Sequence, residues 1–303
     1  MSTPVVTRGC LLEARDIVKS FGQTPALRGA SVAVGQGEIL AIMGPSGSGK
    51  STLLHCLAGI YEPDRGEVWF DGRRLDTLSE AERTRLRRTA FGFVFQFGQL
   101  VPELTAADNV ALPLLLNRTS RKLAYKAAGA WLDRLGLGDK GGRRTGELSG
   151  GEAQRVAVAR ALALAPKVVF ADEPTGSLDS LTGEKVMDLM TGLARQQGAT
   201  VVVVTHDARV ASYADRVVMV RDGRVSADLG TGGAPRSPTA AAAPVRPKRG
   251  PRGNSHPQPG PRPRASHLPK AVDGPSSPIE GGRWSIDRPP SAEVAVAFPR
   301  GGA

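Results

Sequence analysis

The sequence predicts an α/β fold in which a parallel β-sheet is covered on both faces. Strand-like and helix-like patterns alternate between residues 11 and 230 of the 303-residue chain. The strand-like segments are short and rich in β-branched residues, as in residues 200–205, and an amphipathic helical pattern precedes that strand at residues 182–196. Short apolar strands separated by helices are typical of parallel sheets that are buried on both faces.

The first hundred residues contain strands, a helix and a turn signal. Apolar and β-branched runs predict three strands, at residues 11–17, 29–34 and 38–43. The third run ends in a Gly-rich turn, and a helical pattern follows at residues 51–58. Asp71-Gly72 and, later, Asp222-Gly223 stand between β-rich segments. Both central residues of a tight hairpin turn need positive φ, so these pairs predict two hairpins.

The middle of the sequence changes to mostly helical patterns. Residues 79–89 predict a charged surface helix and residues 91–95 a short strand. A helical stretch then extends from residue 106 to residue 164, with a break at residues 136–142. We therefore expect a separate helical lobe over about residues 97–164. Beyond it, β-rich segments predict three more strands, at residues 168–171, 200–205 and 216–220.

Residues 231–303 differ from the rest of the chain in composition. They carry 11 basic and 4 acidic side chains, a net charge of +7, whereas residues 1–230 carry 29 and 25, a net charge of +4. They also hold 15 of the 23 prolines and 10 of the 37 glycines. This composition, without a strict period, predicts a disordered basic tail, either solvated or in contact with anionic lipid. The basic charge arises mainly from this tail, and we expect no nucleic-acid partner.

Several classes of protein are excluded by the pattern of apolar residues and cysteines. The longest apolar runs, such as residues 201–204, fall far short of the roughly 20 residues that span a bilayer. The N-terminal residues show no charged region followed by an apolar one, so we expect no secretory signal. Two cysteines, Cys10 and Cys56, form neither a disulfide framework nor a zinc site. We expect a cytoplasmic chain with one compact domain at residues 11–230.

A glycine-rich segment at residues 44–51 has the spacing of a phosphate-binding loop. Its residues are Gly44-Pro45-Ser46-Gly47-Ser48-Gly49-Lys50-Ser51, which match G-x-x-x-x-G-K-[ST]. The glycines allow backbone N–H groups to surround phosphate oxygens, and the following helix presents its positive N-terminal end. Lys50 adds a cation, and the Ser51 hydroxyl is a hard oxygen suited to Mg²⁺. The strand before the loop and the helix after it argue against a chance match.

Two carboxylates, Asp172 and Glu173, follow the apolar strand predicted at residues 168–171. In a parallel sheet, this end of a strand lies at the edge where ligands bind. Asp172 can hold Mg²⁺ directly or through water, and Glu173 can orient or deprotonate an attacking water. By itself such a pair is usually a solvated strand end. The phosphate loop favours the functional interpretation.

A second helix start follows the sequence Leu148-Ser149-Gly150-Gly151-Glu152. Read alone, it is an ordinary N-cap and loop. It is also suited to binding an anion, because free N–H groups and the helix dipole point at the same place. Spacing alone leaves both interpretations open.

In their order along the chain, these motifs resemble the ATP-binding subunit of an ATP-binding-cassette (ABC) transporter. The resemblance covers residues 11–230. The matching motifs are the phosphate loop, the glutamine loop at Gln96, the signature at residues 148–152, the Asp172-Glu173 strand end, the D-loop Ser177-Leu178-Asp179 and the switch histidine His206. The resemblance implies a P-loop NTPase cassette with a RecA-like parallel-sheet core, an antiparallel β subdomain and a helical signature lobe.

The resemblance also implies roles for single residues. Glu173 would be the catalytic base, and His206 and Gln96 the other catalytic residues, with His206 sensing the γ-phosphate. Ser51, Gln96 and Asp172 would surround Mg²⁺ or its waters. Phe21 would stack on adenine, at a position more often Tyr. The implied ATP-binding residues are Phe21, Gly44, Pro45, Ser46, Gly47, Ser48, Gly49, Lys50, Ser51, Thr52, Ser149, Gly150, Gly151 and Asp179. Read alone, Phe21 would be a core residue, Gln96 a polar loop residue and His206 a strand-end histidine.

Because each chain has one phosphate loop and one signature, the resemblance implies a head-to-tail homodimer in the ATP-bound state. Ser149 and Gly151 would contact the γ-phosphate bound to the other subunit, and Asp179 would cross the same interface. Two ATP molecules would bridge the subunits, and hydrolysis would break the bridge.

Residues 91–96 and 104–113 are similar to the lipoprotein-release and macrolide-export branch of the family, whose members work with an FtsX-like permease. This implies a cassette at the cytoplasmic face of the plasma membrane that powers export or membrane extraction. A regulatory ATPase that moves no solute and an importer subunit are the alternatives. Four apolar residues after the glutamine loop are candidates for docking on the permease or for helix packing: Leu100, Val101, Leu104 and Val110. The substrate is not encoded in these motifs.

Overall fold

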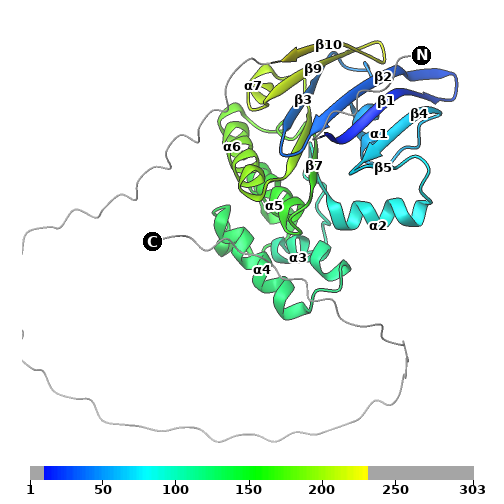
Figure 1. The fold of residues 1–303 in the computed structure, drawn as a ribbon. Helices are drawn as coiled ribbons and strands as arrows, with labels where there is room; N and C mark the ends of the chain where they lie inside the picture. The colour runs from blue at the N-terminus through cyan, green and yellow to red at the C-terminus, as the bar shows by residue number, and fades with distance from the viewer. Residues whose placement is uncertain (1–9, 231–303) are drawn as a thin grey trace, which may run out of the picture. The chain divides into compact units, whose positions relative to one another are not determined.

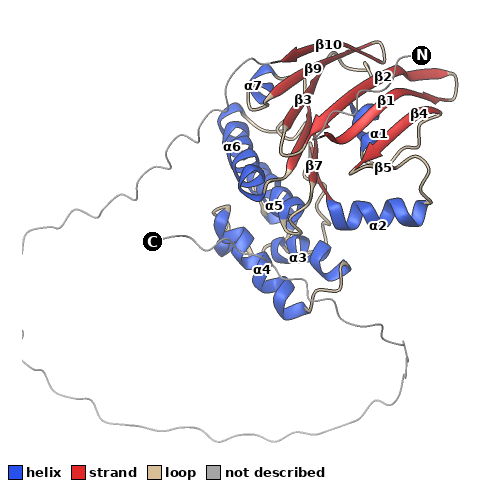
Figure 2. Ribbon diagram, viewed as in Figure 1, coloured by secondary structure: helices blue, strands red, loops and turns tan. Residues whose placement is uncertain are grey.

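The computed structural model describes residues 10–230. The disordered tail predicted for residues 231–303 lies outside the described residues. The described part of the chain contains two β-sheets and a group of helices, with most strands toward one end and a cluster of helices toward the other (Figure 2).

The larger sheet consists of the strands β3 (Ile39–Met43), β6 (Phe91–Phe95), β7 (Val168–Asp172), β8 (Thr200–Val204), β9 (Arg216–Arg221) and β10 (Arg224–Gly230). Their order across the sheet is β10-β9-β3-β8-β7-β6. All neighbours are parallel except β10, which is antiparallel to β9. The carboxyl ends of β3, β7 and β8 therefore meet at one edge, which is where the predicted phosphate loop and carboxylates begin.

Both faces of this sheet are buried, as the sequence predicts. Along β8, Val201 and Val203 belong to one apolar core, whereas Val202 and Val204 belong to the other. This alternation follows from the two-residue period of a strand. The first core is completed by helices α5 (Gly150–Leu162) and α6 (Ser180–Gln197), which lie side by side in Figure 1. The second is completed by helix α1 (Lys50–Leu57) and a smaller sheet.

The smaller sheet is antiparallel, in the order β2-β1-β4-β5. Its strands are β1 (Cys10–Phe21), β2 (Thr24–Gly35), β4 (Arg65–Phe70) and β5 (Arg73–Arg74). The first two are longer than the sequence predicts, because Gly22 at φ 59° closes a tight turn and lets Phe21 pair with Thr24. The hairpin therefore carries Phe21 at its tip.

Both Asp-Gly pairs form the hairpin turns that the sequence predicts. Asp71 and Gly72 have φ values of 48° and 74° and join β4 to β5. Asp222 and Gly223 have the same two values and join β9 to β10. Positive φ at two successive positions is the requirement that selects these residues.

The helical lobe contains α3 (Ala106–Leu116), α4 (Arg121–Arg134) and the segment that leads from α4 to α5. Two short 3₁₀ turns, η1 (Gly138–Lys140) and η2 (Thr145–Glu147), occupy the segment between α4 and α5. A capping box fixes the start of α3: Thr105 Oγ1 accepts from Asp108 N at 3.1 Å, and Thr105 N donates to Asp108 Oδ2 at 3.1 Å. Trp131 and Leu132 of α4 pack into the first core.

Two helices complete the described chain. Helix α2 (Glu80–Ala90) has no buried residue, in agreement with the predicted charged surface helix. Helix α7 (Ala208–Ala211) is a single turn after β8. Within residues 10–230, no helix is long and apolar enough to cross a bilayer.

Candidate nucleotide site

The phosphate loop joins the carboxyl end of β3 to the first residue of α1. Gly44, Gly47 and Gly49 have φ values of 150°, 77° and 102°, which side-chain-bearing residues rarely adopt. A Cβ on Gly49 would lie 2.5 Å from the carbonyl oxygen of Ala26, and a Cβ on Gly44 would overlap the carbonyl oxygen of Val220. The glycines are thus required both by the turn and by the strands packed against it.

Two buried polar side chains of this loop lack a partner among the described residues: one forms no ion pair, and the other forms no hydrogen bond. Lys50 is only 8% exposed, and its Nζ donates to the carbonyl oxygen of Pro45 at 2.9 Å. Within residues 10–230 it forms no ion pair. The Ser48 hydroxyl is buried and has no hydrogen-bond partner among the described residues. A buried cation that forms no direct ion pair in the described chain and an unsatisfied hydroxyl at one helix start are the features of an anion site.

A hard-oxygen pair lies beside the loop at the end of β7. The Ser51 hydroxyl donates to Asp172 Oδ1 at 3.0 Å. Burial raises the pKa of the Asp172 carboxyl, while the Ser51 hydrogen bond opposes that shift. A carboxylate and a hydroxyl this close form a donor set suited to Mg²⁺, because both are hard oxygen ligands. The predicted metal residues Ser51 and Asp172 are therefore brought together.

Glu173 and His206 meet at the ends of β7 and β8. His206 Nδ1 lies 2.8 Å from Glu173 Oε1, and the Thr205 hydroxyl donates to Glu173 Oε2 at 3.3 Å. Glu173 has φ 47°, a conformation that is uncommon for a residue with a side chain and is concentrated at functional sites. Its backbone N–H donates to the carbonyl oxygen of Val204 at 2.9 Å, which ties the two strand ends together. The Glu173 side chain is 20% exposed, so water can reach it.

Gln96 follows β6, beside the segment that comes after Glu173. The Ser177 hydroxyl donates to the Gln96 carbonyl oxygen at 2.7 Å. A Cβ on Gly176 would lie 2.8 Å from Gln96 Nε2, so glycine allows this close approach. No hydrogen bond or ion pair of the described chain joins the Gln96 side chain to Ser51 or Asp172. The third predicted metal residue thus lies at the same sheet edge, and among the described residues no hydrogen bond joins it to the other two.

The signature motif opens α5 with a capping box. Ser149 Oγ accepts from Glu152 N at 3.3 Å, and Ser149 N donates to Glu152 Oε2 at 2.8 Å. Ser149 and Gly150 are exposed. Among the described residues, no hydrogen bond or ion pair links residues 149–151 to the phosphate loop of the same chain. The two predicted phosphate-binding helix starts are therefore separate features of this chain.

Two further predicted residues have clear local roles. Asp179 caps α6 by accepting from Thr182 N at 3.0 Å, and hydrogen bonds from the Thr182 side chain and backbone N–H lower the pKa of its carboxyl. Phe21 is 47% exposed at the tip of the β1–β2 hairpin and is not a core residue.

The structure adds one residue that the sequence analysis missed. Gln154 is 2% exposed, and its Nε2 donates to the carbonyl oxygens of Phe95 at 2.9 Å and Pro174 at 2.6 Å. It therefore connects the signature helix to the residue before Gln96 and to the residue after Glu173. The sequence does contain a sign of this role, because Gln154 is a polar residue on an otherwise apolar face of the predicted helix. Buried polar side chains are normally hydrogen-bonded, so such a residue indicates a buried hydrogen bond.

Comparisons with known proteins agree with this geometry. The family model described as ABC transporter matches residues 27–176. The lipoprotein-releasing system ATP-binding protein LolD of Myxococcus xanthus is 46% identical over 220 residues, which cover 71% of this chain and 98% of that protein. The chain belongs to the ABC transporter ATP-binding proteins. An uncharacterized ABC transporter ATP-binding protein of Methanocaldococcus jannaschii, MJ1508, is 44% identical over 71% of this chain and 97% of its own length.

Solved structures of ABC cassettes have the same fold. A dimeric post-hydrolysis state of the ATP-binding cassette MJ0796, bound to ADP and Pi, is 39% identical with a TM-score of 0.68, covering 74% of this chain and 100% of that one. A cassette from Clostridium perfringens, part of the transporter complex cbiONQ, is 30% identical with a TM-score of 0.67 and covers 74% of this chain and 89% of that one. These likenesses confirm the predicted ABC cassette fold and the assignment of the chain as an ATP hydrolase.

Proposed function

We propose that this cassette hydrolyses ATP at two composite sites formed by a head-to-tail homodimer, and that hydrolysis drives a separate FtsX-like permease. The observation that carries the ATPase half of the proposal is the buried Lys50 cation, which forms no direct ion pair within residues 10–230 and lies at a helix start beside the Ser51–Asp172 oxygen pair. The Glu173–His206 contact at the neighbouring strand ends supplies a base and a residue to orient it. Together they can position a triphosphate and a water for phosphoryl transfer.

In this proposal each side chain acts at a stated position. The loop N–H groups and Lys50 bind phosphate oxygens, and Glu173 Oε2 accepts the proton of the attacking water while His206 holds Oε1 in place. Ser51 and Asp172 would hold Mg²⁺, with Gln96 joining through water. The ion would neutralise charge on the phosphates. A chelator should therefore abolish hydrolysis by the purified chain, and added Mg²⁺ should restore it.

The dimer half of the proposal follows from the exposed signature. Ser149 and the N–H groups of Gly150 and Gly151 are accessible and have no phosphate-loop partner in their own chain. A γ-phosphate presented by a second copy would satisfy them, and Asp179 at the start of α6 would cross the same interface. The dimeric MJ0796 cassettes support this arrangement for the present chain.

A groove beside the glutamine loop supports the permease half of the proposal. It has a volume of about 480 Å³. Its lining is mostly apolar and includes Phe93 and Phe95 of β6. The charged residues of the lining are Arg87, Arg88 and Arg160. Because Phe95 directly precedes Gln96, an occupant of the groove would contact the strand that leads into the nucleotide site. We propose that the occupant is an amphipathic cytoplasmic helix of the permease that carries acidic residues. Arg87 is paired with Glu80, but within residues 10–230 Arg88 and Arg160 form no ion pair, so acidic side chains of the partner would supply their counter-charges.

The structure corrects part of the predicted docking surface. Leu100 and Val110 are 8% and 0% exposed and belong to the first core, so their role is helix packing. Val101 and Leu104 are only partly exposed. In their place, the groove presents Leu112 and Leu116, and Leu116 is 56% exposed.

Purification of the Glu173→Gln chain with ATP from solubilised membranes tests the whole proposal. Co-purification of an FtsX-like permease, identified by mass, would support export or membrane extraction and place the protein peripherally at the cytoplasmic face. Co-purification of a permease that depends on a solute-binding protein would instead indicate that the chain is the ATPase subunit of an importer. Arg88→Glu should weaken retention of the permease, because Arg88 lines the groove. Arg85→Glu is the matched control, because Arg85 lies exposed on the same helix and does not line the groove.

A further inference from the structure

The hairpin tip that carries Phe21 is packed against a second aromatic residue. The ring centroids of Phe21 and Tyr61 are 5.3 Å apart and their planes are inclined at 73°, which is an edge-to-face contact. Lys19, two residues earlier on β1, places its Nζ over the Phe21 ring, 5.9 Å from the centroid. Phe21 nevertheless remains 47% exposed, so much of its surface is free to receive a ligand.

Tyr61 belongs to the segment that leaves the end of α1. The backbone N–H groups of Ile60 and Tyr61 both donate to the carbonyl oxygen of His55, at 2.9 and 3.2 Å. The Tyr61 ring also meets the His55 ring at 90°, with centroids 5.1 Å apart. The position of Tyr61 is thus fixed by its contacts with His55 of α1, the helix that begins at the phosphate loop.

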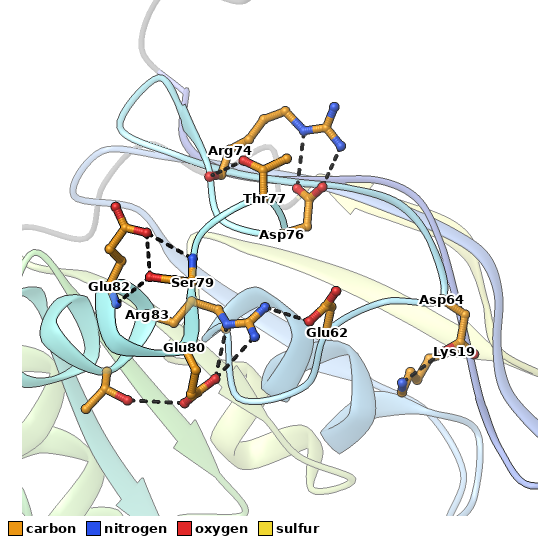
Figure 3. Close-up of polar contacts among 12 residues, drawn as sticks. Lys19, Glu62, Asp64, Arg74, Asp76, Thr77, Ser79, Glu80, Glu82 and Arg83 are labelled. Carbon is orange, nitrogen blue, oxygen red and sulfur yellow. Dashed lines mark hydrogen bonds and ion pairs between the residues drawn. The ribbon is translucent and has the colours of Figure 1, made fainter.

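The same segment is fastened to β1 by Asp64. Its two carboxylate oxygens accept from Lys19 Nζ at 2.9 Å and from Ser20 N at 2.7 Å, and its own N–H donates to the carbonyl oxygen of Val18 at 2.8 Å. Figure 3 shows the Lys19–Asp64 pair. These bonds fix the end of the strand that carries Phe21 relative to the segment that carries Tyr61.

Helix α2 holds the segment from the other side. Arg83 Nη1 lies 3.0 Å from Glu62 Oε2, and Arg83 is itself held by Glu80 at 3.2 Å (Figure 3). Arg87 Nη1 donates to the carbonyl oxygen of Gly59 at 2.6 Å. The segment from Gly59 to Asp64 is therefore bonded to three elements, although it has no regular structure of its own.

We propose that Tyr61 is a positioning residue for the nucleobase: it holds the Phe21 ring in the orientation that receives adenine. This inference rests on the proposed ATP-binding function. A phenylalanine at a hairpin tip can rotate about two side-chain bonds, and ordering it on binding costs affinity. The edge-to-face contact with Tyr61, made before the ligand arrives, removes part of that cost. Within the described residues the Tyr61 hydroxyl makes no hydrogen bond, so its ring is the part that acts.

Two ligands separate this role from a general structural one. The full 303-residue chain is titrated with ATP and with inorganic tripolyphosphate, which has the phosphates without the base, and ATPase kinetics are measured in parallel. Tyr61→Leu should weaken ATP binding about three- to tenfold, the value of one aromatic pair, and raise KM by the same factor without changing kcat. Tripolyphosphate binding should be unchanged. Tyr61→Phe should behave as wild type.

A double-mutant cycle tests whether Tyr61 acts through Phe21. Phe21→Leu should weaken ATP binding, and adding Tyr61→Leu to it should have little further effect, because the contact is already lost. Equal loss of ATP and tripolyphosphate binding in Tyr61→Leu would overturn the proposal, as would unchanged ATP affinity or additive effects in the cycle. Failure of the ATP-binding function itself has a different signature: the wild-type chain would bind neither ligand.

Discussion

The starts of helices α1 and α5 are both predicted to bind phosphate, yet they are built in opposite ways. At α1 the N-cap is Gly49, no side chain caps the helix, the first turn has no acidic residue, and Lys50 is buried. At α5 the N-cap is Ser149, a capping box is present, and Glu152 lies in the first turn. The first helix start leaves its N–H groups available to an external anion, whereas the second has a side-chain cap of its own.

In the proposed dimer, this difference would let one chain carry half of each of two sites. An uncapped helix start with a buried lysine is suited to binding phosphate strongly, because no side chain of the described residues caps its N–H groups. A capped helix start offers only the N–H groups of Gly150 and Gly151 and releases its ligand more easily. Strong binding at α1 combined with weak capture at α5 is what an ATP-dependent dimer requires, since only the weaker contact has to break after hydrolysis.

Substitution of Glu173 should separate ATP binding from ATP turnover. Glu173→Gln keeps the shape and size of the side chain but removes the group that accepts the proton of the attacking water, so kcat should fall about 10²- to 10⁴-fold. Both helix starts are untouched, and ATP should therefore hold the dimer together. Size-exclusion chromatography with ATP should show a stable dimer, and steady-state assays should show almost no phosphate release. Normal turnover would contradict the role assigned to Glu173.

The next effect should be confined to the α1 half-site. Lys50→Ala removes the buried cation, and loss of one partner of a desolvated charge pair costs about 2–5 kcal/mol, so ATP affinity should fall at least about 30-fold. Isothermal titration of the full chain measures this directly. Lys122→Ala is the control, because Lys122 lies on the outer surface of α4, away from either helix start. Equal affinity in the wild type and Lys50→Ala would remove the basis for calling residues 44–51 a phosphate site.

A third substitution should affect only the α5 half-site. Gly150→Asp places a carboxylate in the first turn of α5, where it interacts favourably with the helix dipole and leaves the fold intact. A Cβ on Gly150 would make an ordinary 3.4 Å contact with Leu178. The new charge would repel a γ-phosphate, so ATP binding by the monomer should be unchanged while ATP-dependent dimerisation weakens about tenfold or more. Reduced affinity for ATP in the monomer would mean that the signature contacts nucleotide within its own chain.

The sequence predicted the α1 half-site more completely than the α5 half-site for a physical reason. The phosphate loop owes its function to backbone conformation, and the residues that permit it, such as Gly44 and Gly49, are visible as letters at fixed spacing. For residues 148–152 the sequence alone left a plain N-cap and an anion site equally open, because the same residues serve both. The family resemblance, and not the spacing, separated them.

Contacts between distant segments were the part that the sequence could not supply. Gln154 joins α5 to β6 and to Pro174, which follows β7, across 59 and 20 residues of sequence. Tyr61, in the segment after α1, meets Phe21 at the end of β1. The strand order that brings these segments together depends on tertiary packing. The same limit applies to Leu100 and Val110, where an apolar residue in a helical pattern is compatible with either a core or a docking surface.

The weakest effect should come from a substitution at Glu152 that makes the start of α5 more like the start of α1. Hydrogen bonds from the Ser149 N–H and side chain lower the pKa of the Glu152 carboxyl, so Glu152 carries a negative charge at neutral pH and keeps it in moderate acid. Lys140 lies 3.7 Å away and offsets that charge only in part. Glu152→Gln retains a side chain that can accept from the Ser149 N–H but removes a negative charge close to the incoming phosphate. ATP-dependent dimerisation of the Glu173→Gln chain should therefore tighten about two- to fivefold at low salt.

Because both charges are near the surface, this gain should shrink as ionic strength rises and the Debye length falls below about 10 Å. Sedimentation velocity at two salt concentrations measures it, with Glu147→Gln as the control, since Glu147 caps the preceding 3₁₀ turn instead of α5. A gain that persists at high salt would indicate that the substitution acts through the fold of α5. Weaker dimerisation would show that Glu152 itself contributes to the interface, and the anion-repelling role assigned to it would be wrong.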